Sequence, residues 1–341
     1  MGIPGPDPRA ERGAPLLEVD ALTVALPTES GPRAAVDGVS FSIGRGEGVA
    51  LVGESGSGKT QLARALLGLS PDVARVSGRV RFEGRELAAL PDAAWGRVRG
   101  PGIAAVFQEP AAALDPVRTV GEHLAEAIGL HRRAPRAEVR RVSVEALAAA
   151  AFPDPESALA MYPHRLSGGL QQRVCIAIAL APAPRLLIAD EPTASLDATV
   201  ALEILTLIDR LRAERGLAVL LITHDLGIAA RHADRVVVLY AGRIVEEASR
   251  AALFAAPRHP YTRALLRSAP RLAASRRPGE RFAAIPGAPP SLAARSDRGC
   301  AFAPRCPDRF APCTESEPDL EPLDGGRVRC FLHTAGAGAR P

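Results

Sequence analysis

The chain has 341 residues and a formal net charge of +4, with 42 Lys and Arg against 38 Asp and Glu. This length allows one large domain or two ordinary ones, each with a hydrophobic core. No run of 18 apolar residues predicts a membrane span, so we expect a cytoplasmic protein. No block of five basic residues occurs, which indicates solvated arginines and argues against a nucleic-acid partner.

The chain contains a single lysine, Lys59, in the stretch GESGSGKT. Apolar residues ending at Val52 predict a strand before this stretch, and QLARALLGL after it has the apolar spacing of a helix. Such a strand, glycine loop and helix start turn backbone N–H groups inward, where they bind a phosphate chain. An arginine is planar and forked and cannot enter such a loop as a point charge, which explains the lysine.

The pattern G-x-x-x-x-G-K-T predicts a nucleoside triphosphate site in which Lys59 contacts the β- and γ-phosphates and Thr60 binds Mg²⁺. The residues predicted to bind ATP are Gly53, Glu54, Ser55, Gly56, Ser57, Gly58, Lys59, Thr60 and Gln61.

Two acidic residues, Asp190 and Glu191, follow the apolar run from Leu186 to Ala189. The run predicts a buried parallel strand, and ligands of α/β sheets bind at the carboxyl ends of such strands. We expect Asp190 to hold the Mg²⁺ shell and Glu191 to orient or deprotonate the attacking water. A solvated acidic pair is the alternative, and the phosphate loop elsewhere in the chain argues against it.

Polar side chains follow two further predicted strands. His224 ends the stretch LLITH, and Gln108 follows IAAVF. A lone histidine is more often structural than catalytic, but its place after an apolar strand favours a γ-phosphate contact, and Gln108 allows the same interpretation.

The stretch LSGGLQQ places Ser167, Gly168 and Gly169 before a long helical pattern. A serine and two glycines at a helix start predict a second anion site. One nucleotide does not need two phosphate cradles, so we expect this one to serve the nucleotide of another subunit.

In this order the motifs resemble the nucleotide-binding subunit of ATP-binding cassette (ABC) transporters, over about residues 16–254. The resemblance implies an α/β P-loop NTPase fold of the ABC type, with a RecA-like core, an antiparallel β subdomain and an α-helical subdomain. It implies a catalytic group of Glu191, His224 and Gln108, and Mg²⁺ contacts from Thr60, Gln108 and Asp190. It also identifies LSGGLQQ as the family's signature motif, whose residues contact the nucleotide bound by the partner subunit; here these are Ser167, Gly168, Gly169 and Gln171. Asp197 would belong to the family's D-loop.

A narrower resemblance, to the oligopeptide/dipeptide importer branch, rests on FQEPAAALDP, YAGRIVE, HPYTRALLRSAP, IPGAPPSL and GCAFAPRC. It implies a peripheral protein at the cytoplasmic face of the membrane that powers uptake of short peptides or related solutes. The implied partners are a second ABC ATPase subunit, two integral-membrane permease subunits and, indirectly, an extracytoplasmic solute-binding protein. The branch commonly uses two different ATPases, which favours a paralogue over a homodimer.

These patterns divide the chain into three parts. Residues 1–14 are rich in Pro and Gly, lack the apolar core of a signal peptide and are expected to form a flexible tail. Residues 15–255 are expected to form the ATPase domain, with its helical subdomain at about 108–173. Residues 256–341 are expected to form a loop-rich C-terminal extension that contains cysteines.

Four cysteines of this extension, Cys300, Cys306, Cys313 and Cys330, have the spacing C-x5-C-x6-C-x16-C. The spacing lacks the CxxC pair of common zinc ribbons. Four thiolates can still hold a [4Fe–4S] cluster or Zn²⁺, and unliganded thiols are the third alternative. The importer branch is similar here and some of its members carry a cluster, which favours that reading. The fifth cysteine, Cys175, lies in an apolar helical pattern and is predicted to be a core residue.

One departure from the family concerns the adenine base. The family usually stacks adenine on an aromatic residue, but Leu26 occupies the corresponding place and no Phe, Tyr or Trp lies between Leu16 and Ser40. We expect weak discrimination between bases.

Two other classes stay open at this point. A soluble ABC ATPase of DNA repair or translation usually has two cassettes, each with its own phosphate loop (Walker A motif). This chain has one such motif, GESGSGKT. A metal- or redox-sensing ATPase would explain the cysteines, but no DNA-binding motif accompanies them.

Overall fold

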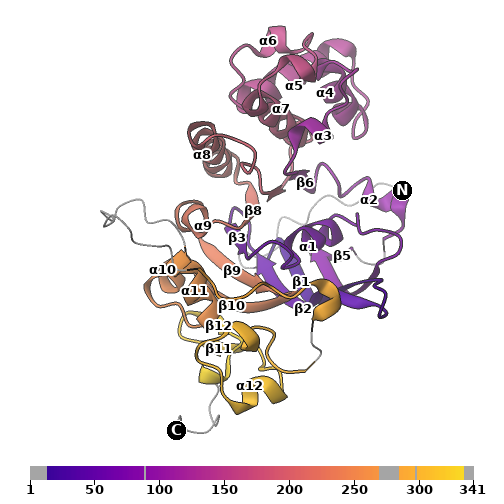
Figure 1. The fold of residues 1–341 in the computed structure, drawn as a ribbon. Helices are drawn as coiled ribbons and strands as arrows, with labels where there is room; N and C mark the ends of the chain where they lie inside the picture. Colours follow the sequence, from indigo (N-terminus) through magenta and orange to yellow (C-terminus); the bar gives the residue numbers. More distant parts are fainter. Residues whose placement is uncertain (1–13, 88–89, 269–283, 296–297, 334–341) are drawn as a thin grey trace, which may run out of the picture.

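The computed structural model describes residues 14–87, 90–268, 284–295 and 298–333 (Figure 1). The expected N-terminal tail, apart from its last residue, lies outside these ranges. Within them, no helix is both long and apolar enough to cross a membrane.

The larger sheet has eight strands in the order β11-β12-β10-β9-β3-β8-β7-β6. Strands β9, β3, β8, β7 and β6 are parallel, whereas β10, β12 and β11 continue the sheet antiparallel. The parallel strands are short apolar runs with helices on both sides, as expected for a sheet that is buried on both faces. Their bounds are β3 Gly48–Val52, β6 Ile103–Val106, β7 Leu186–Asp190, β8 Ala218–Thr223 and β9 Arg235–Tyr240.

The smaller sheet is antiparallel, in the order β2-β1-β4-β5. Its strands are β1 Leu17–Leu26, β2 Arg33–Ile43, β4 Arg75–Phe82 and β5 Arg85–Glu86. Apolar residues of this sheet, of α1 (Lys59–Leu66) and of the larger sheet form one continuous core. The sheet is the antiparallel β part that the resemblance implies.

A group of helices lies between β6 and β7 in the chain and projects away from the sheets at the top of Figure 1. It comprises α3 Pro110–Ala113, α4 Val120–Gly129, α5 Arg136–Ala149, α6 Pro155–Ala158, the 3₁₀ turn Pro163–Arg165 and α7 Gly168–Leu180. Its core continues into that of α8 (Ala198–Arg215) and one face of the larger sheet. Cys175 is buried in this core, as predicted, and burial raises its pKa to about 12. The remaining helices of the cassette are α2 Asp92–Trp95 and α9 Leu226–His232.

The C-terminal extension is more ordered than its composition predicts. After β10 (Arg243–Ser249) and α10 (Arg250–Ala255) the chain forms α11 Pro260–Ser268, α12 Ala311–Glu315, the strands β11 Glu321–Leu323 and β12 Gly326–Val328, and 3₁₀ turns at Leu292–Ala294, Ala303–Arg305 and Phe331–His333. Except for α11, the elements that the structure describes after α10 are three to five residues long. Strand β12 pairs with β10, so the extension continues the main sheet. Tyr261, Leu265 and Phe302 pack in one core with Val52 and Val238.

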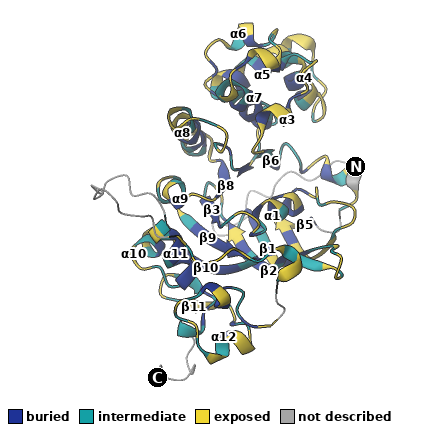
Figure 2. Ribbon diagram, in the orientation of Figure 1, coloured by how far each residue is buried: buried dark blue, intermediate teal, exposed yellow. Residues whose placement is uncertain are grey.

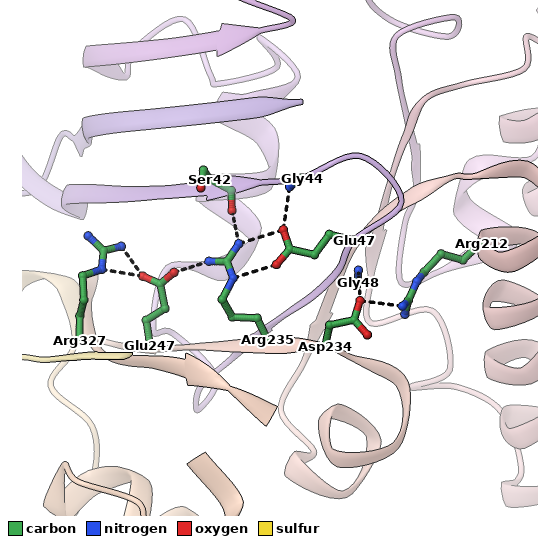
Figure 3. A network of polar contacts seen from close by, with 9 residues as sticks. All are labelled: Ser42, Gly44, Glu47, Gly48, Arg212, Asp234, Arg235, Glu247 and Arg327. Carbon is green, nitrogen blue, oxygen red and sulfur yellow. Dashed lines mark hydrogen bonds and ion pairs between the residues drawn. The ribbon is translucent and has the colours of Figure 1, made fainter. Parts of the chain in front are cut away.

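A chain of ion pairs joins the two sheets and the extension where β3 begins (Figure 3). The Arg235 guanidinium donates to Glu47, at 2.9 Å from Nε to Oε1, and also pairs with Glu247. Glu247 in turn binds Arg327 of β12. Because Glu247 is buried, losing both Arg235 and Arg327 would leave an uncompensated charge. Figure 2 shows that β3 and β9, which lie beside these residues, are largely buried.

Candidate nucleotide site

Three parallel strands end at one edge of the sheet and bring the predicted residues together. In register, Val52 of β3 pairs with Thr223 of β8, and Asp190 of β7 pairs with Ile222 of β8. The glycine loop, the acidic pair and His224 all follow at this edge. The strand predictions made from the apolar runs are confirmed here, and Asp190 is the last residue of β7.

The loop from Gly53 to Gly58 needs glycine at two places where the backbone passes close to other chain segments. A Cβ on Gly53 would lie 2.2 Å from the carbonyl oxygen of Leu239, and one on Gly58 would lie 2.4 Å from that of Ala35. Gly58 also has φ of 109°, in the region that favours glycine. Helix α1 begins directly after it, at Lys59, so its first-turn N–H groups lack intrahelical partners and can bind an anion.

The Lys59 side chain is buried in this loop, with 6% of the residue exposed. Its Nζ donates to the carbonyl oxygens of Gly53 at 2.7 Å and Glu54 at 3.1 Å, and to Ser57 Oγ at 3.4 Å. Burial lowers the pKa of Lys59, and the nearby carboxylates Glu191, Asp190 and Glu54 oppose that shift. The three acceptors surround the ammonium closely, which leaves little room for a guanidinium.

Asp190 lies against the start of α1. It is buried, and burial raises its pKa, whereas a side-chain hydrogen bond with Thr60 and the charge of Lys59 lower it. A carboxylate and a hydroxyl side by side are the oxygen ligands that Mg²⁺ accepts alongside phosphate oxygens and water. The pair thus fits the Mg²⁺ site predicted for Thr60 and Asp190.

Glu191 has an unusual backbone conformation, with φ of 46°, that turns it out of the strand. Its N–H donates to the carbonyl oxygen of Ile222 at 2.9 Å, which holds the turn in place. The carboxylate Oε2 lies 3.2 Å from Nδ1 of His224, whose side chain is 60% exposed. A carboxylate held by an imidazole at the phosphate edge is suited to binding and deprotonating water.

The other predicted residues lie outside this cluster. Gln108 is exposed two residues after β6, at the entry to the helical group. Ser167 is the N-cap of α7, and its Oγ accepts from Leu170 N at 3.4 Å, while Gln171 Nε2 donates to Pro163 O at 2.9 Å. Asp197 caps α8 by accepting from Thr199 N and Val200 N. Figure 1 shows helix α7 in the helical group, apart from α1. Within one chain, the two anion sites are therefore separate.

Sequence reasoning missed three residues of the extension that contact the glycine loop. The Arg305 guanidinium binds the Glu54 carboxylate through both oxygens, Tyr261 Oη accepts from Glu54 N, and Arg295 donates to Gly56 O. Tyr261 and Arg305 belong to the motifs HPYTRALLRSAP and GCAFAPRC, but nothing local in those motifs indicates a partner more than 200 positions away.

The four cysteines of the extension line one pocket. Cys313 and Cys330 are buried and the other two are half-buried. Within the described ranges, no three His, Cys, Asp or Glu side chains are grouped so as to bind a single metal ion.

The phosphate loop and the acidic strand end define a P-loop nucleotide-binding protein, and the helical group inserted between β6 and β7 makes it one of the ABC type. Comparison with known proteins agrees. A family profile described as ABC transporter matches residues 36–194, and a second one, Oligopeptide/dipeptide transporter, C-terminal region, matches residues 245–313.

Curated relatives give the closer placement. The oligopeptide transport ATP-binding protein OppD of Escherichia coli (strain K12) is 44% identical over 317 residues, which cover 93% of each chain. OppD of Mycobacterium tuberculosis (strain ATCC 25618 / H37Rv) is 50% identical over 308 residues, and this chain spans about half the length of that relative. A solved dimer of the ATP-binding cassette MJ0796 bound to ADP and Pi superposes with a TM-score of 0.62 at 30% identity, covering 69% of this chain and 98% of the other. The chain belongs to the ABC transporter family, and these curated relatives are named as ATP-binding proteins of oligopeptide transport.

We predict that Lys59→Arg lowers ATP turnover about 100-fold or more, since losing one well-placed donor to transition-state charge has that effect. The charge is kept but the guanidinium does not fit among the three acceptors. Steady-state phosphate release by the purified chain measures the effect. Arg64→Lys, an exposed position on the same helix, is the matched control and should retain turnover; normal activity of Lys59→Arg would contradict the role of lysine shape.

We predict that Glu191→Gln keeps ATP binding but lowers turnover at least about 100-fold, because the amide cannot accept the proton of water. Nucleotide binding and phosphate release are measured on the same preparation, and ATP-bound dimers should accumulate on size-exclusion chromatography. The exposed Glu214→Gln on α8 serves as control. Wild-type turnover in Glu191→Gln would remove Glu191 from the chemistry.

Proposed function

We propose that this chain hydrolyses ATP to power the import of short peptides or related solutes through a membrane permease. The observation that carries the proposal is the separation of its two anion-binding helix starts. Lys59 begins α1 at the sheet edge, whereas Ser167 caps α7 in the helical group. Each is half of a phosphate site, so a second ATPase subunit arranged head to tail would complete both.

In this arrangement ATP lies between the loop of one subunit and the signature of the other. Lys59 and the first-turn N–H groups of α1 bind the triphosphate, Thr60 and Asp190 hold Mg²⁺ with Gln108, and Glu191 activates water beside His224. Ser167, Gly168, Gly169 and Gln171 would contact the partner's nucleotide, and Asp197 would lie at the subunit boundary. Binding closes the dimer and hydrolysis reopens it.

The helical group, expected at about residues 108–173, would receive the permease at the cytoplasmic face of the membrane. The profile match of residues 245–313 and the coverage of the E. coli OppD relative favour this function over that of a soluble repair or translation ATPase. The solute-binding protein and the permease subunits determine which solute is transported. The second ATPase is either a paralogue or a second copy of this chain.

The test is reconstitution with the membrane subunits. We expect the chain to co-purify with two permease subunits and to support ATP-dependent uptake of labelled di- to pentapeptides into liposomes containing them, given the solute-binding protein. Uptake should disappear with Glu191→Gln and persist with Glu214→Gln. ATP turnover by a chain that binds no permease and supports no uptake would contradict the proposal and favour a soluble ATPase.

We further propose that Cys300, Cys306, Cys313 and Cys330 hold a [4Fe–4S] cluster, with Zn²⁺ as the alternative. All four line the same pocket. Burial raises the pKa of Cys300, Cys306 and Cys330, and the backbone N–H groups of Phe302, Asp308 and Leu332, two residues further on in each case, oppose that shift. Such N–H donors stabilise metal-bound thiolates. The four thiols need not converge on one atom, since each cysteine of a cubane binds a different iron. A bound cluster would tie four points of the extension together.

Iron and sulfide analysis of the chain purified without oxygen tests this second proposal. We expect about four irons with matching sulfide per chain, and their loss in Cys306→Ser. The buried Cys175→Ala, outside the pocket, should retain both. Zinc in place of iron, or no metal, would contradict the cluster and leave the ATPase proposal intact.

A further inference from the structure

Glu54, the first residue after Gly53, connects the phosphate loop to the extension through both its side-chain carboxylate and its backbone N–H. Its carboxylate accepts from Arg305 Nη1 at 2.6 Å and Nη2 at 3.0 Å, and its N–H donates to Tyr261 Oη at 2.9 Å. Its carbonyl oxygen accepts from Lys59 Nζ and from Ser57 N. Glu54 is therefore the link between the extension and the lysine that contacts phosphate.

Arg305 is built into the extension with little freedom to move. Nε donates to Pro286 O at 2.8 Å, Nη2 also donates to Gly287 O, and Nη1 also donates to Tyr240 Oη. With the two bonds to Glu54, all five N–H donors of the guanidinium are used. The side chain is 5% exposed, lies over the rings of Tyr240 and Phe302, and has a pKa raised by hydrogen bonding to Glu54.

Three aromatic residues pack together beside the Arg305–Glu54 pair and form an aromatic cluster. Tyr240, Tyr261 and Phe302 contact one another with ring centroids 4.6 to 5.3 Å apart, and all three are fully buried. Tyr240 is the last residue of β9, and Phe302 lies two residues after Cys300 in the extension. The cassette and the extension therefore both contribute to this aromatic cluster. Planar bidentate pairs held this way fix orientation as well as distance.

The charge of Glu54 makes Arg305 necessary. Glu54 lies within the loop that binds a polyphosphate, and an unpaired carboxylate there would repel the nucleotide. The Arg305 guanidinium neutralises this carboxylate through two hydrogen bonds.

We propose that Arg305 is a positioning residue for ATP: acting through Glu54, it neutralises the one carboxylate of the phosphate loop and fixes the carbonyl oxygen that orients Lys59. The proposal concerns ATP binding by this chain alone. It rests neither on the transported solute nor on the metal content of the extension, so its failure and theirs are distinguishable.

The first measurement is the affinity of Arg305→Gln for AMP-PNP with Mg²⁺, by titration calorimetry. We expect Kd to rise about tenfold, as one charge-assisted interaction is lost. In steady-state ATP turnover KM should rise by a similar factor, while kcat stays within about twofold. A purely structural role would lower the active fraction, and so kcat, and leave the KM of the folded molecules unchanged.

Removing the repelling charge provides the second measurement. In Arg305→Gln/Glu54→Gln the unpaired carboxylate is gone, so AMP-PNP should bind more tightly than to Arg305→Gln, with Kd within about threefold of the wild type. Arg263→Gln is the matched control, because Arg263 pairs with Asp308 at 2.9 Å within the extension and does not touch the loop. Its Kd should be that of the wild type.

Two results would overturn the proposal: an unchanged Kd in folded Arg305→Gln, or a double variant that binds no better than Arg305→Gln. Should Arg305→Gln fail to fold, Arg305→Lys provides the test. It keeps one charge but not the bidentate geometry, and should raise Kd by a smaller factor than expected for Gln; an unchanged Kd there also overturns the proposal.

Discussion

The nucleotide site depends on one constraint: the parallel strands β3, β7 and β8 end level with one another at the same edge of the sheet. Every residue of these three strands is buried, and their parallel register pairs Val52 with Thr223 and Asp190 with Ile222. Because side chains alternate along a strand, a slip of one residue would move Asp190 away from Thr60 and its partners. Buried apolar strands that fix the register therefore act directly on the chemistry at their ends.

The parts of the site that could be predicted are those encoded in consecutive residues. A glycine loop between a strand and a helix has a strong local signal, and so does an acidic pair after an apolar run. The structure places Lys59, Thr60, Asp190 and Glu191 together accordingly. Ser167 at the start of α7 was also readable, because a serine before two glycines and a helical pattern is a local capping signal.

Contacts between distant segments left no such signal. Arg305 and Glu54 are 251 positions apart, and the pairing of His224 with Glu191 depends on the order of β7 and β8 in the sheet. The extension was expected to be loop-rich because most of its elements are three to five residues long, too short to show a period. Its order comes from packing against β9 and β10, which only the folded chain reveals.

The single lysine has a consequence for chemistry carried out on this protein from outside. An amine-directed reagent finds one side chain in the entire chain, and that side chain is the one expected to touch the nucleotide's phosphates. Burial, which lowers the pKa of Lys59, increases the neutral, nucleophilic form of its amine, while the walls of the loop restrict access. Apart from the α-amino group, Lys59 Nζ is therefore the one amine of this chain that can be acylated, and a bound triphosphate shields it. Likewise, a protease that cuts only after lysine has one cleavage site, the bond between Lys59 and Thr60 in the first turn of α1.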